Sequence, residues 1–369
     1  MADISSGEQR AEIFYDSAFR KFGELAASPG AILQRHISLA GRIVRIEISA
    51  GAMERAVMPA LSHLIVPEVA EPDLVLCVWD SESTGAPPMS PGWGPEDYRR
   101  EGYISGFNDA RFHTGMQFEP IILRMIDMER RRAMYWTADA SKLPYWEIGA
   151  PLRPLLHEWL QRVGMVAIHG GAVGRADGGV FLAGAGGQGK SNVALACLNS
   201  NLLYASDDFC FLSQSPEWTA HSLYCTGKMA AGDLVRHPYL RGVESNPDRL
   251  DREKALFFLN EKFADRLIRQ LPLRAIVLPR VIAQGPSKIA PVASAVAHKA
   301  IAMSTIELSR WTGGHTLRKV SELLRERPCY ELCVGASIDE VPPLLDKLLN
   351  ELRPNRHQHA QRGSGGGRS

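Results

Sequence analysis

The sequence lacks the segments that direct a chain into or across a membrane. Its first residues, MADISSGEQRAEIF, are polar and carry acids, without the basic and then apolar pattern of a secretory signal. No apolar run approaches the roughly 20 residues that a membrane-spanning helix needs. The sequence therefore predicts a cytoplasmic protein with no membrane partner.

Net charge and cysteine are also scarce. The formal net charge is +1, so no overall field favours a nucleic acid, and we expect no nucleic-acid partner. The 6 cysteines are scattered and do not have the spacing of metal ligands. Cys329 and Cys333 flank a strand-like run and are predicted to be packed thiols. This cysteine usage is typical of a cytosolic protein with reduced thiols.

Length and composition indicate two folded domains. The chain has 369 residues, of which 45% are hydrophobic and 22% charged, as in ordinary soluble proteins. We predict a mainly β (α+β) domain over residues 1–150 and an α/β domain over 151–352. The polar, basic and glycine-rich residues 353–369 are expected to be a disordered tail.

Hydrophobic periodicity predicts the main elements of both domains. The first domain is expected to have a helix at 51–64, a loop at 82–97, and strands at 36–49, 72–80, 111–127 and 132–139, with Gly41 at a turn or bulge. The second is expected to have strands at 165–174, 273–283 and 329–334, and helices at 144–164, 251–270, 296–311, 316–327 and 338–353.

The most informative motif is GAGGQGKS at residues 184–191, which fits the G-x-x-x-x-G-K-[ST] pattern of a phosphate-binding loop. Glycines allow successive backbone N–H groups to point at one phosphate chain, and the lysine adds a charge near the outer phosphates. A serine hydroxyl at the last position can ligate Mg²⁺. An apolar strand precedes the loop and a helix former follows it, which is the arrangement that such a loop requires. The predicted nucleotide-binding residues are Gly184, Gly186, Gly187, Gln188, Gly189, Lys190, Ser191 and Asn192.

Two acids and a histidine are expected beside this loop. Asp207 and Asp208 follow the apolar run LLYAS, where an acid at a strand tip would lie close to Mg²⁺. His169 ends the strand-like run VAIH, and strand tips next to a phosphate loop face one crevice. From the residues alone, capped turns and a structural histidine remain alternatives.

The runs AIHGGAV, VFLAGAGGQGKSNVALACL and LYASDDF together resemble the catalytic core of HPr kinase/phosphorylase, a bacterial serine kinase. Further runs, including APLRPLLHEWL, HSLY and PCYELCVG, are similar to the HPr-kinase-like proteins of peptide-modification gene clusters, among them the lasso-peptide kinases. The resemblance implies a C-terminal P-loop kinase domain of HPr kinase type that uses ATP and Mg²⁺.

The resemblance also implies roles for individual residues. Asp207 matches the acid that accepts the proton of the substrate hydroxyl, and Asp208 matches the acid on the Mg²⁺ side with Ser191. His169 matches the histidine beside the base, and Lys190 keeps its phosphate-loop role. Lys228 would bring a second positive charge near the transferred phosphate. The predicted catalytic residues are thus Asp207, His169 and Lys190, the metal ligands Ser191 and Asp208, and the substrate contact Lys228.

The chain departs from the HPr kinases in two respects. The long glycine-containing signature that these enzymes use for dephosphorylation is absent downstream of the paired aspartates, which argues against phosphorylase activity. The N-terminal half also differs from theirs, which argues against HPr as substrate. The predicted acceptor is a serine of a ribosomally made precursor peptide, held by the N-terminal domain, and a homo-oligomer is compatible with the sequence.

Three other functions remain open at this stage. One is a kinase for a small-molecule hydroxyl, and another is a nucleotide-gated ATPase or binding module. The third is a nucleotide-binding protein whose site has decayed. A kinase needs an acid at the acceptor, which the paired aspartates supply, whereas no water-positioning residue of a switch is identifiable.

Four tryptophans in the N-terminal half are candidates to anchor a peptide, because aromatic side chains bind with few rotamers to freeze. Trp79 and Trp136 lie in strand-like runs and are expected in the core. Trp93 lies in a loop rich in proline and glycine and is predicted to be the most exposed, while Trp146 has no assigned role.

Overall fold

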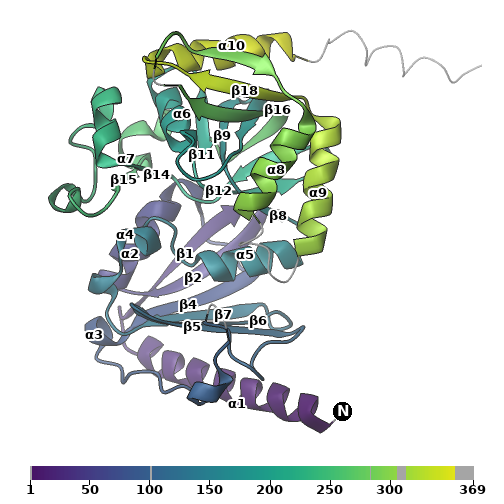
Figure 1. Ribbon diagram of the computed structural model, residues 1–369. Coiled ribbons are helices and arrows are strands. Elements are labelled where there is room, and N and C mark those ends of the chain that lie inside the picture. Colours follow the sequence, from purple (N-terminus) through teal and green to yellow (C-terminus); the bar gives the residue numbers. More distant parts are fainter. Residues whose placement is uncertain (1, 100–101, 283, 306–312, 354–369) are drawn as a thin grey trace, which may run out of the picture.

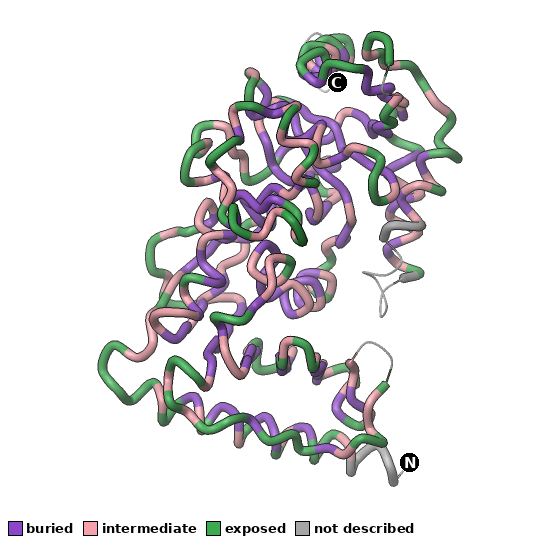
Figure 2. The backbone as a smooth tube through the Cα atoms, turned by 60° about the vertical axis from the view of Figure 1, so that its left-hand side comes forward, coloured by how far each residue is buried: buried purple, intermediate pink, exposed green. Residues whose placement is uncertain are grey.

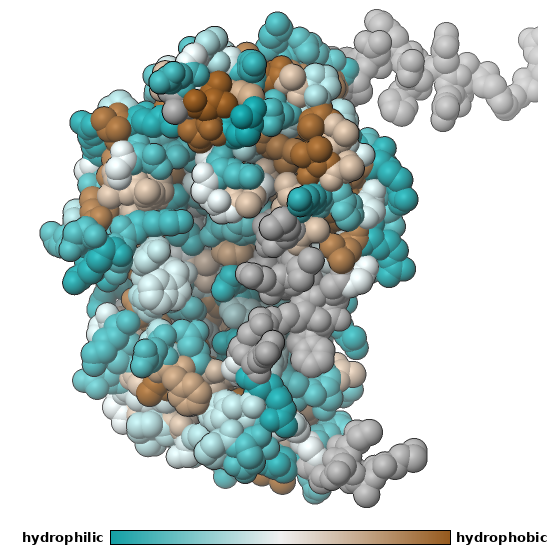
Figure 3. Space-filling model, in the orientation of Figure 1, coloured by the Kyte–Doolittle hydropathy of each residue, from teal (hydrophilic) through white to brown (hydrophobic). Residues whose placement is uncertain are grey.

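A computed structural model describes residues 2–99, 102–282, 284–305 and 313–353, and it shows a mixed α/β protein with two main sheets (Figure 1). The predicted tail, 353–369, lies outside the described residues apart from Arg353. No helix in the described ranges is long and apolar enough to cross a membrane. The face in Figure 3 is mainly hydrophilic, with separate groups of apolar side chains.

The first sheet has seven strands in the order β3-β1-β2-β4-β7-β6-β5. Their bounds are β1 Ile32–Leu39, β2 Arg42–Ser49, β3 Ile65–Val66, β4 Leu74–Asp80, β5 Phe112–Phe118, β6 Ile121–Asp127 and β7 Arg132–Thr137. The hairpin of β1 and β2 turns at Ala40 and Gly41, which both have positive φ, and this confirms the predicted turn. The predicted strands of this region are therefore confirmed.

Helices cover both faces of the first sheet. The long helix α1 (Ala2–Ala26) packs on one face, while α2 (Ala52–Leu61) and α5 (Arg153–Arg162) pack on the other (Figure 1). The short helix α3 (Ser81–Thr84) directly follows β4, and the short helix α4 (Tyr145–Ile148) precedes α5. The sequence analysis identified α2 and α5 but did not predict α1.

The prediction that Trp93 is exposed is wrong. Trp93 is 8% exposed, because Phe14 of α1 and Phe107 each pack against it with ring centroids 5.0 Å apart. Trp79 and Trp136 are buried, as predicted. Trp146 in α4 is instead the exposed tryptophan of this half, with 51% of its surface accessible.

The second sheet has nine strands, and its main path is β11-β9-β10-β16-β13-β12-β8, with β18 beside β16 and β17 beside β18. The bounds are β8 Val166–His169, β9 Gly171–Arg175, β10 Gly178–Leu182, β11 Leu203–Ser206, β12 Phe209–Ser213, β13 Thr219–Ser222, β16 Gln270–Val281, β17 Lys288–Pro291 and β18 Cys329–Val334. Strands β10, β16 and β18 run parallel. These central strands are buried, as the tube in Figure 2 shows.

Helices also flank the second sheet. Residues of α6 (Lys190–Ala196) and α10 (Val341–Glu351) share one buried cluster, and residues of α8 (Ser294–Thr305) and α9 (Gly313–Glu326) share another. The prediction of a helix over 296–311 is confirmed as far as residue 305, and residues 306–312 lie outside the described part. Cys329 and Cys333 are buried free thiols, as predicted.

The predicted helix at 251–270 is wrong in its first half. Residues Ala255–Phe258 form strand β15, which pairs with β14 (Thr226–Met229), whereas Asn260–Phe263 are α-helical, as α7, and Ala264–Arg266 form a short 3-10 helix. Pairing with a distant strand buries Ala255, Leu256 and Phe257 completely, and this burial outweighs the local helical spacing.

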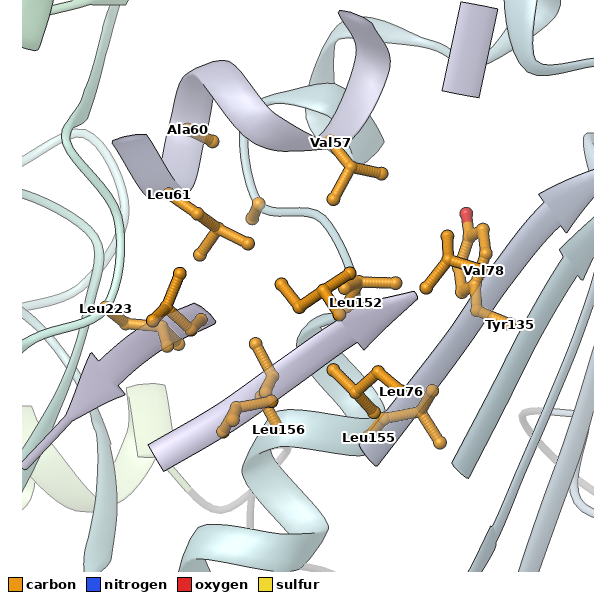
Figure 4. Close-up of a cluster of buried hydrophobic side chains, with 14 of the residues drawn as sticks. Val57, Ala60, Leu61, Leu76, Val78, Tyr135, Leu152, Leu155, Leu156 and Leu223 are labelled. Atoms are coloured by element: carbon orange, nitrogen blue, oxygen red, sulfur yellow. The ribbon is translucent and has the colours of Figure 1, made fainter. Parts of the chain in front are cut away.

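One hydrophobic cluster joins the two sheets (Figure 4). Leu76 and Val78 of the first sheet pack with residues of α2 and with Leu155 and Leu156 of α5, which cover the same face of that sheet. Leu223, from the segment that follows β13, belongs to the same cluster. The core therefore continues across residue 150, where the sequence analysis placed the domain boundary.

Candidate active site

The loop at 184–191 has the backbone that a phosphate-binding loop needs. It connects β10 to α6, and Ala183 at its start is tied to the neighbouring parallel strand by a hydrogen bond to the Val277 carbonyl of 2.9 Å. Gly184, Gly187 and Gly189 have φ values of 147°, 80° and 95°, a region that side chains rarely allow. The glycines of the motif are thus required by the observed conformation.

This loop presents free donors. Within the described ranges, no acceptor bonds the backbone N–H of Gly186, Gly187 or Gly189, and α6 begins directly after them. Lys190 is 6% exposed, and its ammonium donates to the carbonyl oxygens of Gly184 at 2.7 Å and Ala185 at 3.1 Å. A loop with N–H groups and a lysine around one concavity can hold an anion such as a phosphate chain.

Two further residues of the predicted nucleotide set serve the loop indirectly. The Gln188 side chain accepts from the Ala185 N–H at 3.1 Å, so it braces the turn from inside. Asn192 donates to Asp233 at 2.9 Å and contacts the His237 ring at 3.1 Å. Asn192 therefore ties α6 to the segment after β14, and these two contacts are made with that segment and not with the phosphate loop.

The paired acids lie where two strands meet. Asp207 and Asp208 form the connection between β11 and β12, and β12 pairs with β8 so that Phe209 lies opposite His169. The N–H of Gly170 donates to the Asp208 carbonyl at 2.8 Å. A side chain at Gly171 would come within 2.9 Å of the Ser206 carbonyl, so this glycine permits the close approach of the two segments.

Asp208 is held by His169 and Lys228. One carboxylate oxygen is 3.2 Å from Nδ1 of His169 and the other is 3.1 Å from Nζ of Lys228. Burial by itself would raise the pKa of Asp208, but the interactions with Lys228 and His169 outweigh it, so the pKa lies below its usual value. Burial lowers the pKa of His169, and this imidazole is accordingly neutral near pH 7.

Asp207 is in a different environment. It is 2% exposed and accepts a hydrogen bond of 3.1 Å from the backbone N–H of Lys228. Burial, with the neighbouring Asp208 charge, raises the pKa of Asp207 to about 6, against the lowering effects of Lys228 and of the Ser191 hydroxyl. The Ser191 hydroxyl is therefore close enough to Asp207 to act on its pKa, which brings the phosphate loop and the acids into one site.

The four site residues predicted from outside the loop, namely Asp207, Asp208, His169 and Lys228, therefore lie together beside it. The charges of both Asp207 and Asp208 act on Lys190, whose pKa burial lowers. A narrow crevice beside the acids is lined by Gly149, Ser206, Asp207, Asp208, Phe209, Tyr224, Thr226 and Lys228. Lys228, which only the family resemblance had assigned to the site, is one of the residues that line this crevice.

Sequence reasoning missed several residues of this crevice. Thr226 and Tyr224 donate to the carbonyls of Gly149 and Pro151, at 2.7 Å and 2.8 Å, so the segment before α5 forms one wall. Arg153, the first residue of α5, lies with its guanidinium carbon 4.8 Å from the centroid of the Phe209 ring. No local motif indicates these residues, because the contact depends on how the two sheets pack.

No protein-family model and no curated protein matches the chain. Among solved structures, it is similar to the Hpr(Ser) kinase/phosphatase from Coxiella burnetii, with a TM-score of 0.27 and 12% sequence identity. The match covers 50% of this chain and 94% of that one. A TM-score of 0.27 is too low to assign a fold or an activity, so the residues of the site carry the functional conclusion.

Proposed function

We propose that this protein is an ATP-dependent kinase that phosphorylates a serine hydroxyl of a ribosomally made precursor peptide. The observation that carries the proposal is the convergence of two devices: a loop of free N–H groups with Lys190, and the buried Asp207 and half-buried Asp208 beside His169. The first suits a phosphate chain, and the second suits a hydroxyl that must lose a proton.

The transfer requires one bond to form and one to break. The serine oxygen attacks the γ-phosphorus, the bond to the oxygen bridging the β- and γ-phosphorus atoms breaks, and its electron pair leaves with ADP. The hydroxyl proton passes to a carboxylate of the acid pair. Lys190 and the loop N–H groups would offset the charge on the phosphates during this exchange.

Asp207 is proposed as the proton acceptor. Its pKa of about 6 is close to the pH of a neutral medium, and a carboxylate serves best as a general base when its pKa lies near the working pH. The effect of the Ser191 hydroxyl on the pKa of Asp207 supports a second assignment, in which Asp207 lies on the metal side and Asp208, braced by His169 and Lys228, receives the proton. Replacing each acid in turn separates the two assignments.

The site fits Mg²⁺ by its donor set. Ser191, Asp207 and Asp208 offer a hydroxyl and carboxylate oxygens, the hard ligands that Mg²⁺ prefers, and Mg²⁺ in kinases commonly uses only one or two protein carboxylates with substrate phosphates. When bound, the ion supplies positive charge to the phosphates. Ser191 and Asp208 are the proposed ligands, with Asp207 as the alternative to Asp208.

A partly exposed aromatic pair beside the crevice supports a peptide as acceptor. Trp146 and Tyr145 form an edge-to-face pair, with centroids 5.3 Å apart, on α4 directly before the crevice residue Gly149. An aromatic residue that is 51% exposed next to a reaction site is suited to hold a flexible chain. We therefore place peptide recognition on the N-terminal half, with Trp146 in the role that the sequence favoured for Trp93.

The test is a transfer assay with γ-labelled ATP, Mg²⁺ and a library of serine-containing peptides. We expect label on a serine hydroxyl with the wild-type protein and no label with Lys190→Ala or without Mg²⁺. If label is transferred only to small alcohols or sugars, the acceptor assignment is wrong. Release of labelled phosphate without any labelled acceptor would favour the nucleotide-gated ATPase instead.

A further inference from the structure

One cation of the site, the guanidinium of Arg153, has neither an ion pair nor a hydrogen bond within the described part of the chain. Lys228 is ion-paired to Asp208, and Lys190 donates to two carbonyl oxygens. Arg153 is half-buried, yet in the described part of the chain no carboxylate lies within ion-pair distance of its guanidinium. A guanidinium stays charged and offers five donors in a plane, so a partly desolvated and unpaired one is typical of an anion-binding position.

Arg153 lies at the acid pair. Its guanidinium carbon is 4.8 Å from the centroid of the Phe209 ring, whose other neighbours are the His169 ring at 5.4 Å and Nζ of Lys228 at 5.9 Å. Its charge acts on Asp208 and on His169. Arg153 is therefore part of the same electrostatic cluster as the reacting groups.

Arg153 and the phosphate loop come from different layers of the fold. Arg153 begins α5, which packs against the first sheet, whereas Lys190 begins α6, which packs within the second (Figure 1). Asp207 and Asp208 connect β11 to β12, and His169 ends β8, so all three belong to the second sheet. Two cations from different layers, Lys190 and Arg153, thus act on the same pair of Asp208 and His169.

We propose that Arg153 binds the phosphoryl group after its transfer, as the receptor for a phosphate monoester on the acceptor oxygen. This inference rests on the proposed kinase function and names a residue for its product side. A monoester dianion can accept two parallel N–H···O bonds from a guanidinium, which a lysine cannot supply. Lys190 remains with the phosphates of ADP, so the two products are held by different cations.

The test measures binding and does not depend on turnover. N-acetyl-phosphoserine amide is titrated by calorimetry into the ADP–Mg²⁺ complex of the wild-type protein and of Arg153→Gln, Arg153→Lys and Arg162→Gln. Arg162 ends the same helix and is exposed, so its variant controls for loss of charge on α5. We expect at least a tenfold loss of affinity in Arg153→Gln, a smaller loss in Arg153→Lys and no change in Arg162→Gln.

Parallel titrations identify the ligand. The serine amide is expected to bind equally to wild type and Arg153→Gln, and ADP affinity is expected to be unchanged. Inorganic phosphate should bind more weakly than phosphoserine amide if the acceptor contributes. The proposal is overturned if Arg153→Gln binds phosphoserine amide as wild type does, if wild type does not bind it, if an aspartyl amide shows an equal loss, or if ADP affinity falls by the same factor.

The outcome is separable from that of the kinase proposal. If Lys190→Ala binds ATP as tightly as wild type does, the assignment of the nucleotide site is wrong. Phosphoserine binding at Arg153 would still be measurable in that case. A melting curve of each variant checks the fold, and Arg153→Lys keeps the test valid if Arg153→Gln does not fold.

Discussion

A fragment of residues 151–353 should fail to fold by itself, because its core is incomplete without the first sheet. The cut exposes a face lined by eight apolar side chains of the shared cluster: Leu152, Leu155, Leu156, Trp159, Leu160, Phe211, Leu223 and Tyr224. Full burial of such a side chain contributes ~1.5–3 kcal/mol, so losing half of it at each position costs roughly 6–12 kcal/mol. The free energy of unfolding of a domain is only about 5–15 kcal/mol, so this loss leaves the fragment with little or no net stability.

The assay is expression of the fragment alone and together with residues 1–150. Alone, it should bind a dye for exposed apolar surface and unfold without a cooperative transition. Co-expression with 1–150 should restore cooperative unfolding and Mg²⁺–ATP binding, because the missing face returns. A fragment that unfolds cooperatively and binds Mg²⁺–ATP alone would refute the reasoning and support an independent domain that begins near residue 151.

The remaining predictions concern the site. Lys190→Ala should lower the transfer rate roughly 10²–10³-fold with little change in melting temperature, measured by the labelled-ATP assay; an unchanged rate would contradict the loop assignment. Asp207→Asn should keep ATP affinity but abolish transfer, which single-turnover labelling checks; normal transfer would move the base to Asp208. Asp208→Asn removes the charge that helps to raise the pKa of Asp207, so the acid side of the rate–pH profile, expected near pH 6 in wild type, should move to lower pH. A greater Mg²⁺ requirement in Asp208→Asn, but not in Asp207→Asn, would support Asp208 as the metal ligand. Trp146→Ala should raise the KM for a peptide acceptor and leave kcat and ATP affinity unchanged; an unaffected KM would move peptide recognition elsewhere.

The parts that the sequence predicts well are those that local chemistry determines. The positive φ values at Gly184, Gly187 and Gly189 follow from a motif that needs them, and the turn at Gly41 follows from alternating strands on either side. The proximity of Asp207 and Asp208 to Lys190 follows from their position after a strand. In each case, neighbouring residues carry the information.

The parts that it predicts poorly depend on long-range packing. Residues 255–258 have helical spacing, but β14 offers them a partner and they form β15. Trp93 has a loop-like local sequence, yet Phe14 of α1 covers it. Arg153 reaches the acids only because α5 lies between the two sheets. A single sequence does not show which distant segments meet, so these three features appear only in the fold.

The central claim is that one site both holds ATP and activates a serine hydroxyl. The most direct measurement is mass spectrometry of an acceptor peptide after incubation with ATP and Mg²⁺, with wild type and Asp207→Asn side by side. The account predicts one added phosphoryl group on a serine with wild type and none with Asp207→Asn, although both proteins bind ATP equally. Equal phosphorylation by both proteins, or ATP binding by wild type with no phosphorylated acceptor among the serine peptides, would contradict it.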